Sequence, residues 1–164
     1  MALPINIDEL LHGNTVEWDR IELKNGWNPE DIIHTLCAYA NDINNWDGGY
    51  VIIGVEEENG KAKLPPIGVQ VQELDAIQKK LIELSHKITP AYFPVFQPYF
   101  IQGKHIVVVF APAGDYRPYK APASLGEKRT ERAMYIKRGS KTVKVKNVSD
   151  EERRLIELTA RIPF

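Results

Sequence analysis

The chain is poor in cysteine and has no long apolar run. Its 164 residues include one cysteine, Cys37, within the apolar stretch IIHTLCAYA. A single thiol builds neither a disulfide framework nor a multi-cysteine zinc site, so we expect Cys37 to pack in the core. No stretch approaches the roughly 18 consecutive apolar residues of a membrane span, and the N-terminus MALPINIDEL lacks the basic-then-apolar order of a signal peptide. The sequence therefore predicts a soluble, cytoplasmic protein without a membrane partner.

A nucleotide-binding loop is also missing. The pattern G-x-x-x-x-G-K-[ST] occurs nowhere, and its nearest approach, Gly139-Ser140-Lys141-Thr142, has no glycine at the required distance upstream. The sequence therefore gives no support to an ATP site. Gly48 and Gly49 precede an apolar run, a place where glycine more often lets a helix and a strand approach closely. We expect that packing role for both glycines.

The length and the ending of the chain bear on its organisation. With 43% hydrophobic residues, 164 residues can bury the core of one domain, and nothing calls for a second. Residues 160–164 end on apolar groups directly after an expected helix. We therefore expect residues 1–164 to form a single domain that is the N-terminal part of a longer protein.

The net charge of −1 hides an uneven distribution. Residues 117–146 hold ten lysines and arginines against two acidic residues, a net charge of +8, and the rest of the chain carries −9. A local block of positive charge is expected where a protein meets phosphates, because each neutralised phosphate releases counterions. The plainer alternative is a solvated hairpin with a basic bias.

Three places carry helix signals. Asn28 can cap a helix, Pro29 suits its first position, and apolar residues then recur at three- and four-residue steps through residue 40. A second helix is expected over residues 71–88, where an apolar stripe ends before Pro90. A third opens at Ser149, which has acidic residues at the capping-box spacing.

Strand signals lie between these helices. Residues 48–55 and 104–111 are β-branched apolar runs, and residues 93–101 precede the second run across a tight Gln102-Gly103 turn. Residues 133–138 form a further strand before a Gly139-Ser140 turn. Helices interleaved with strands in this order predict a mixed β-sheet covered by helices, in the α+β or the α/β class.

Three carboxylates stand out by position. Glu17 and Glu22 precede the first helix, and Glu57 follows the buried strand. If residues 16–24 run beside that strand, the sheet brings these acids together, as in sites for hard cations such as Mg²⁺ or Mn²⁺. The alternative is that they are ordinary surface glutamates, with residues 56–60 forming a polar turn.

Aromatic residues interleave with the basic segment. Tyr116, Tyr119 and Tyr135 alternate with cations, the arrangement of a base-stacking platform, although a strand would bury some of them. From this block we predict nucleic-acid contacts by a set of cations and one tyrosine: Lys24, Arg117, Tyr119, Lys120, Arg129, Arg132, Lys137, Arg138 and Lys141.

An ordered set of motifs resembles the Schlafen AlbA-type domain. It comprises Glu17-x-x-x-x-Glu22-Leu23-Lys24, then CAYAN at residues 37–41 and GGYVIIGVEE at residues 48–57. The segments RPYKAP at residues 117–122 and YIKRGS at residues 135–140 are similar to the bacterial branch of the same family. The resemblance thus spans nearly the whole chain.

This resemblance implies two functions from different classes. Bacterial members are described as predicted transcriptional regulators with a DNA-binding domain, often labelled RecG-like helicase relatives, and a winged-helix region commonly follows. Animal relatives include metal-dependent RNA nucleases whose three acids match Glu17, Glu22 and Glu57, with aspartate at the third position.

The leading interpretation is a nucleic-acid-binding domain of a transcriptional regulator, with DNA or RNA as its partner and no required cofactor. The alternative is a nuclease that holds Mg²⁺ or Mn²⁺ on the three acids; because the animal enzymes build their groove from two domains, this chain would then act as a homodimer. A third interpretation is a dimerisation or scaffold module whose basic block meets an acidic protein.

Overall fold

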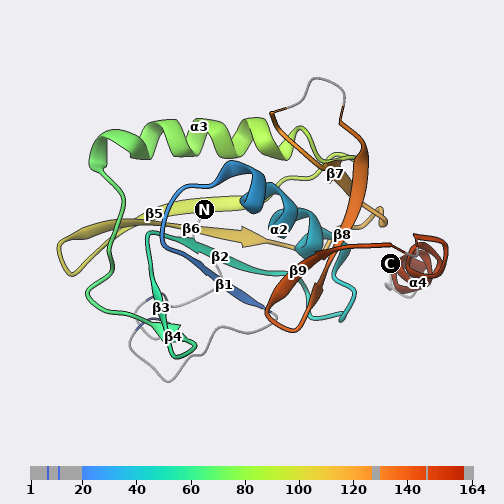
Figure 1. The fold of residues 1–164 in the computed structure, drawn as a ribbon, viewed down its shortest axis with the longest axis horizontal. Coiled ribbons are helices and arrows are strands. Elements are labelled where there is room, and N and C mark those ends of the chain that lie inside the picture. Colours follow the sequence, from blue (N-terminus) through green and yellow to red (C-terminus); the bar gives the residue numbers. More distant parts are fainter. Residues whose placement is uncertain (1–6, 8–10, 12–19, 127–129, 147, 161–164) are drawn as a thin grey trace.

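The three-dimensional arrangement was analysed in a computed structural model, which describes residues 7, 11, 20–126, 130–146 and 148–160 (Figure 1). Helices are interspersed among runs of strands along the chain in an α+β arrangement, as the sequence predicts. In chain order the elements are β1 (Ile21–Lys24), α2 (Pro29–Asn41), β2 (Gly49–Ile53), β3 (Glu57–Glu58), β4 (Lys61–Ala62), the 3-10 turn η1 (Val71–Glu73), α3 (Leu74–Ser85), β5 (Val95–Ile101), β6 (Lys104–Ala111), β7 (Lys120–Pro122), β8 (Arg132–Arg138), β9 (Lys141–Lys144) and α4 (Val148–Ala160).

The central sheet has the strand order β1-β2-β6-β5. Strand β1 lies parallel to β2, whereas β6 is antiparallel to both β2 and β5. The predicted extended segment beside the buried strand is therefore confirmed for residues 21–24. The β5–β6 hairpin turns at Gln102 and Gly103, both with positive φ (48° and 79°), as a two-residue hairpin loop requires.

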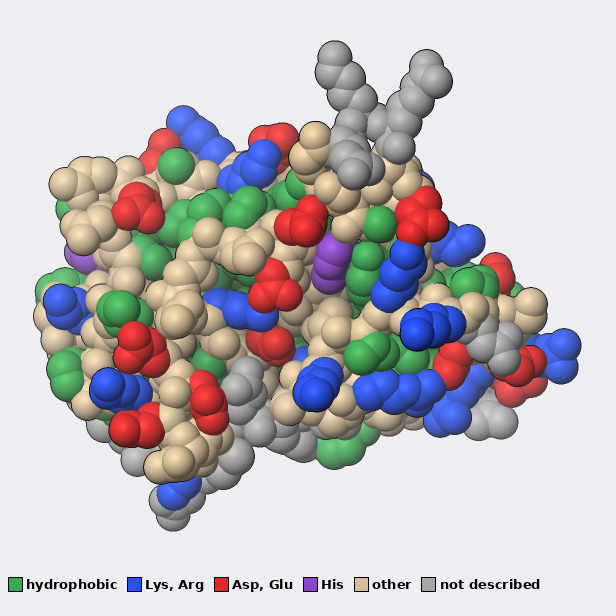
Figure 2. Space-filling model, in the orientation of Figure 1, with side chains coloured by type: hydrophobic (Ala, Val, Ile, Leu, Met, Phe, Trp, Pro, Cys, Tyr) green, Lys and Arg blue, Asp and Glu red, His purple; other side chains and the backbone are tan. Residues whose placement is uncertain are grey.

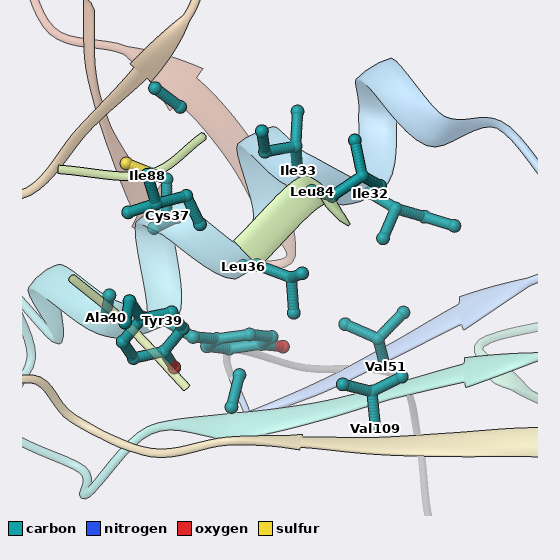
Figure 3. Packing of buried hydrophobic residues seen from close by; sticks show 14 of the residues in the cluster. Ile32, Ile33, Leu36, Cys37, Tyr39, Ala40, Val51, Leu84, Ile88 and Val109 are labelled. Atoms are coloured by element: carbon teal, nitrogen blue, oxygen red, sulfur yellow. The ribbon is translucent and has the colours of Figure 1, made fainter. Parts of the chain in front are cut away.

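Helices α2 and α3 cover one face of the central sheet. Their apolar stripes meet alternate residues of β2 and β6, such as Val51 and Val109 (Figure 3). The intervening residues, such as Ile52 and Val108, are buried on the opposite face. Burial of both faces explains why the sequences of β2 and β6 are nearly continuous apolar runs.

Helix α2 starts where its capping signals lie. The Asn28 side chain accepts a hydrogen bond from the Asp31 N–H at 3.2 Å, and Pro29 occupies the first turn. Cys37 is fully buried, and burial raises the pKa of its thiol to about 12. The packing role predicted for this cysteine is confirmed.

The paired glycines permit a close approach, as predicted. A Cβ at Gly49 would lie 2.2 Å from Cε1 of Tyr39, and one at Gly48 would lie 2.1 Å from the Ala111 carbonyl oxygen. Any side chain at position 49 would displace the Tyr39 ring. Close contact between α2 and β2 therefore requires glycine here.

A second sheet joins β7, β8 and β9 in antiparallel order. Its position depends on Asn41, at the end of α2. The Asn41 amide accepts from the Tyr119 N–H at 2.6 Å and donates to the carbonyls of Tyr119 (3.1 Å) and Tyr135 (2.8 Å). Thr35 on the same helix bonds the Thr142 hydroxyl at 3.1 Å. One helix thus contacts both sheets.

No helix in the described part of the chain is long and apolar enough to cross a membrane.

Replacing Asn41 with alanine tests how strongly this amide fixes the second sheet. The variant removes three bonds to buried backbone groups: the Tyr119 N–H and the Tyr135 carbonyl lose the Asn41 amide, and the Tyr119 carbonyl keeps only the weak Cys37 thiol donor at 3.4 Å. Each unsatisfied group costs about 1–3 kcal/mol. We expect the free energy of unfolding to fall by about 3 kcal/mol or more, measured by urea denaturation followed by circular dichroism. The matched control is the exposed Asn25, where alanine should change stability by less than about 0.5 kcal/mol. Equal effects at both positions would contradict this role.

Candidate nucleic-acid interface

Most of the basic segment folds into the sheet of β7, β8 and β9, which we call the basic sheet. Strand β8 places Ala133 and Tyr135 against α2, while Met134 and Ile136 pack beneath Leu155 of α4. Both faces of its central strand are therefore covered. Cations reach solvent mainly at the ends of β8 and along the neighbouring edge strand.

Five described cations of this segment are exposed: Arg132, Arg138, Lys141, Lys144 and Lys146. Figure 2 shows lysine and arginine side chains gathered over the β8–β9 hairpin and beside α4. Arg138 forms an ion pair with Glu151, and Lys144 forms one with Glu131. Within the described residues no carboxylate pairs with Lys141 or Lys146, so their charge is locally unbalanced.

Arg138 and Lys141 lie directly opposite each other at the end of the β8–β9 hairpin. The Gly139-Ser140 turn between them is exposed, as the sequence predicts for a turn. Side chains opposite each other in an antiparallel pair project from the same face. The hairpin end thus presents two cations together.

Arg132 lies at the other end of β8. One of its Nη atoms donates to the Lys87 carbonyl at 2.6 Å and to the Thr89 hydroxyl at 3.4 Å. Thr89 in turn exchanges two backbone hydrogen bonds, of 3.0 and 2.8 Å, with half-buried Lys120. Arg132 and Lys120, two of the predicted contact residues, therefore lie beside the loop that follows α3.

Three predicted contact residues are buried: Tyr119, Arg117 and Lys137. Tyr119 is 2% exposed, and its hydroxyl accepts a hydrogen bond from the Tyr116 N–H. Arg117 donates from Nε to the Gly114 carbonyl at 2.9 Å. Because none of the three reaches the surface, their prediction as surface contacts needs correction. Arg129 lies outside the described residues.

Lys137 points into the molecule because an acid meets it there. Its ammonium lies 3.0 Å from Oε2 of buried Glu22 and 3.0 Å from the Ser140 carbonyl, and it sits 5.5 Å from the centre of the Tyr39 ring. A buried ammonium needs such partners, since desolvation of an unpaired charge is costly. This contact joins β1 to β8 across 115 residues of sequence.

Lys24 joins Glu22 and Lys137 in a cluster of charged side chains. Its ammonium pairs with Asp31 and lies 3.5 Å from Oε1 of Glu22. Burial by itself lowers the pKa of the Lys24 ammonium, but the hydrogen bond to Asp31 and the charges of Glu22 and Asp31 outweigh burial, and the net shift is upward. Lys24 therefore stays charged, and its ammonium is paired with Glu22 and Asp31.

The three predicted metal ligands are placed differently from one another. Glu57 is exposed on β3, where it accepts a hydrogen bond from the Gly60 N–H, and Glu17 lies outside the described residues. A polar pocket of about 520 Å³ lies between Lys24, Asp31 and Glu57, and Glu22 does not line it.

The described residues alone do not fit a metal ion. Among them no three histidine, cysteine or acidic side chains are grouped to hold one. Both oxygens of Glu22 already face lysine ammonium groups, which neutralise the charge that a hard cation would use. The three-acid site that includes Glu17 stays a prediction.

The other two aromatic candidates, Tyr135 and Tyr116, differ in their exposure to solvent. Tyr135 is buried and stacks on His34 with ring centres 4.0 Å apart, so it belongs to the core. Tyr116 is 73% exposed.

The sequence analysis missed Phe93, which is also exposed, because the apolar residues around it resemble the start of a strand. It also left Lys144 and Lys146 out of the contact set, although both belong to the basic block.

Comparison with known proteins matches residues 17–146 to the family described as Schlafen, AlbA_2. The chain belongs to this family. The match includes β1, β2 and the whole basic sheet, and it confirms the resemblance inferred from the motifs. The Schlafen AlbA_2 family is associated with nucleic acids. None of the curated proteins matches the sequence.

Two solved structures are similar to this Schlafen AlbA_2 domain. The crystal structure of the DIP2311 protein from Corynebacterium diphtheriae is 16% identical, covers 96% of this chain and has a TM-score of 0.60. The chain spans 32% of the length of that protein, and the likeness shows the fold. The solution structure of the N-terminal domain of a RecG-related protein from Nitrosomonas europaea is 25% identical, with a TM-score of 0.49, and the match covers 77% of this chain and 76% of that one.

The buried pair of Glu22 and Lys137 makes a prediction about stability. Removing one partner of such a pair costs about 3–5 kcal/mol when the other charge is left buried and unpaired. We expect Glu22→Gln to lower the free energy of unfolding by that amount, measured by urea denaturation, because Lys137 then has no acidic partner. The loss in Lys137→Met should be smaller, because Glu22 keeps Lys24 at 3.5 Å. The double variant should lose less than the sum of the two single losses, because it leaves neither charge behind.

The matched control for this cycle is the exposed pair of Asp75 and Lys79, which are 2.9 Å apart. Because solvent screens an exposed pair, Asp75→Asn and Lys79→Met should each cost less than about 1 kcal/mol. Strict additivity of Glu22→Gln and Lys137→Met would show that the two side chains do not interact.

Proposed function

We propose that this chain is the nucleic-acid-binding domain of a transcriptional regulator, and that the exposed cations of the basic sheet contact the phosphates. The observation that carries the proposal is the gathering of exposed lysines and arginines over the β8–β9 hairpin and beside α4 (Figure 2). Membership of the Schlafen AlbA_2 family supports the same class of ligand.

The distribution of ion pairs identifies the cations that matter most. Lys141 and Lys146 lack a carboxylate partner among the described residues, whereas Arg138 and Lys144 each have one. A phosphate that approaches Lys141 or Lys146 displaces counterions and breaks no ion pair within the protein. Such contacts contribute the full salt-dependent term of binding.

The shape of the hairpin suits a groove of duplex DNA. Strands β8 and β9 form a two-stranded ribbon whose end carries Arg138 and Lys141 on one face. The major groove of B-DNA, about 12 Å wide, admits a two-stranded ribbon. We propose that the end of the hairpin lies against the duplex, with the phosphates of the groove walls next to these cations.

Fluorescence anisotropy with a labelled duplex, over a series of salt concentrations, tests this proposal. The logarithm of the affinity should fall linearly with the logarithm of salt concentration, and Lys141→Ala and Lys146→Ala should each lower the slope by about 0.9. The matched control is Lys104→Ala, an exposed lysine on the β5–β6 hairpin at the opposite end of the fold (Figure 1). Salt-independent binding, or equal losses from all three variants, would overturn the proposal.

The nuclease alternative is tested separately on denaturing gels. Labelled transfer RNA and single-stranded DNA are incubated with the protein in Mn²⁺ or in chelator. Glu57→Gln is the variant of choice, because Glu57 is exposed while Glu22 supports the fold. Fragments that require Mn²⁺ and vanish in Glu57→Gln would assign metal-dependent cleavage, whereas a binding domain leaves the nucleic acid intact.

A further inference from the structure

A second pocket lies between the loop that precedes β5 and the loop that joins β6 to β7. It has a volume of about 490 Å³ and is formed by two loops, residues 90–93 before β5 and residues 112–119 after β6. Four aromatic residues line it: Tyr92, Phe93, Tyr116 and Tyr119. The apolar lining and the size suit a flat, ring-shaped ligand.

The inner wall of this pocket is fixed by buried contacts. The Tyr92 hydroxyl donates to the Pro112 carbonyl at 2.6 Å, and the rings of Tyr92 and Tyr119 meet edge to face with centres 5.6 Å apart. A Cβ at Gly114 would lie 2.1 Å from the Tyr119 ring, so only glycine allows that ring its place. Burial raises the pKa of both phenols, which therefore keep their protons at neutral pH.

The rim of the pocket is aromatic and open to solvent. Tyr116 is 73% exposed and Phe93 is 68% exposed, more than any other large hydrophobic side chain in the described part of the chain. Neither ring is buried by the fold, although both line the same pocket. A ligand with a flat apolar face would cover them and remove apolar surface from water.

The charges near the pocket favour a ligand that also carries negative charge. No lysine or arginine is among the lining residues, but three cations are connected to the two loops: Arg117 bonds the carbonyl of the lining residue Gly114, Lys120 follows Tyr119 in the chain, and Arg132 bonds Thr89, the residue before Pro90. Among the described residues no carboxylate pairs with the Arg117 guanidinium, and its Nη1 atom is buried without a hydrogen-bond partner. Against these stands one lining acid, Asp115.

The charged and aromatic groups around the pocket allow a choice between two classes of ligand, a cationic side chain and a nucleotide. An aromatic pocket with a single acid resembles a site for a cationic side chain, held over the rings. Lys120 and Arg132, together with the positive potential of the buried Arg117, oppose such a ligand and favour one with phosphates. A nucleotide combines a stacking base with a phosphate, and Asp115 then serves as a hydrogen-bond acceptor for a base amino group.

We propose that this pocket takes one unpaired base of a single strand between Phe93 and Tyr116, with Lys120 and Arg132 next to its phosphates. The inference rests on the proposed function, since the basic sheet supplies the general affinity for nucleic acid. Arg132 and Arg138 are the first and last of the seven residues of β8, so a bound single strand would span about 20 Å between the pocket and the end of the β8–β9 hairpin.

Anisotropy titration with a single-stranded oligonucleotide and with a duplex of the same length tests the inference. In the double variant Phe93→Ala/Tyr116→Ala, the affinity for the single strand should fall about 5- to 150-fold, the range for loss of one base–aromatic stack. Its affinity for the duplex should stay unchanged, because a paired base cannot enter the pocket. Both rings are exposed, and circular dichroism checks that the variant is folded.

The matched control is Phe100→Ala, since Phe100 is 65% exposed on β5 at the far end of the sheet. It should bind both ligands as the wild type does. An oligonucleotide with scattered abasic positions provides a second readout: it should bind the wild type less tightly than the intact strand, and the double variant should not distinguish the two.

Three results would overturn the inference and leave the proposed function standing: equal losses for duplex and single strand, no loss for either, or the same loss in Phe100→Ala. Binding of a trimethyllysine peptide that only the double variant loses, with single-strand affinity unchanged, would assign the pocket to cationic side chains instead. Failure of the wild type to bind either nucleic acid would refute the proposed function itself.

Discussion

The side-chain amide of Asn41 holds the two sheets of this protein in place relative to each other. It lies at the end of α2, fully buried, and bonds the backbone at Tyr119, just before β7, and at Tyr135 in β8. Buried amides are costly unless every polar atom is satisfied, so the three bonds specify one position for the strands. The positions of the β8–β9 hairpin and of the aromatic pocket both depend on this contact.

Buried charge explains why the basic segment is less basic at its surface than its composition indicates. Lys137 is neutralised by Glu22 inside the protein, and Arg117 is enclosed beside Gly114. These two cations contribute to the structure, while Lys141 and Lys146 face solvent. A charge count along a sequence therefore gives an upper limit on the charge available to a ligand.

Local signals predicted the main elements well, because the forces behind them are local. The Asn28 cap and the apolar run of β6 are examples: each is readable within a few residues, and each is confirmed. The short strands β7 and β9 were missed, since their pairing depends on distant partners. Side-chain placement was harder still. Tyr116 and Tyr119 stand three residues apart in one loop, and only the tertiary packing at Gly114 decides which one is buried.

Gly49 affects a contact that it does not itself make. Its hydrogen atom faces the Tyr39 ring, and that ring in turn lies beneath the Lys137 ammonium, which meets Glu22. Any side chain on β2 at this point displaces the ring that the lysine ammonium contacts. A random mutagenesis screen for loss of ligand binding would therefore recover substitutions in the middle of the hydrophobic core, far from every exposed cation.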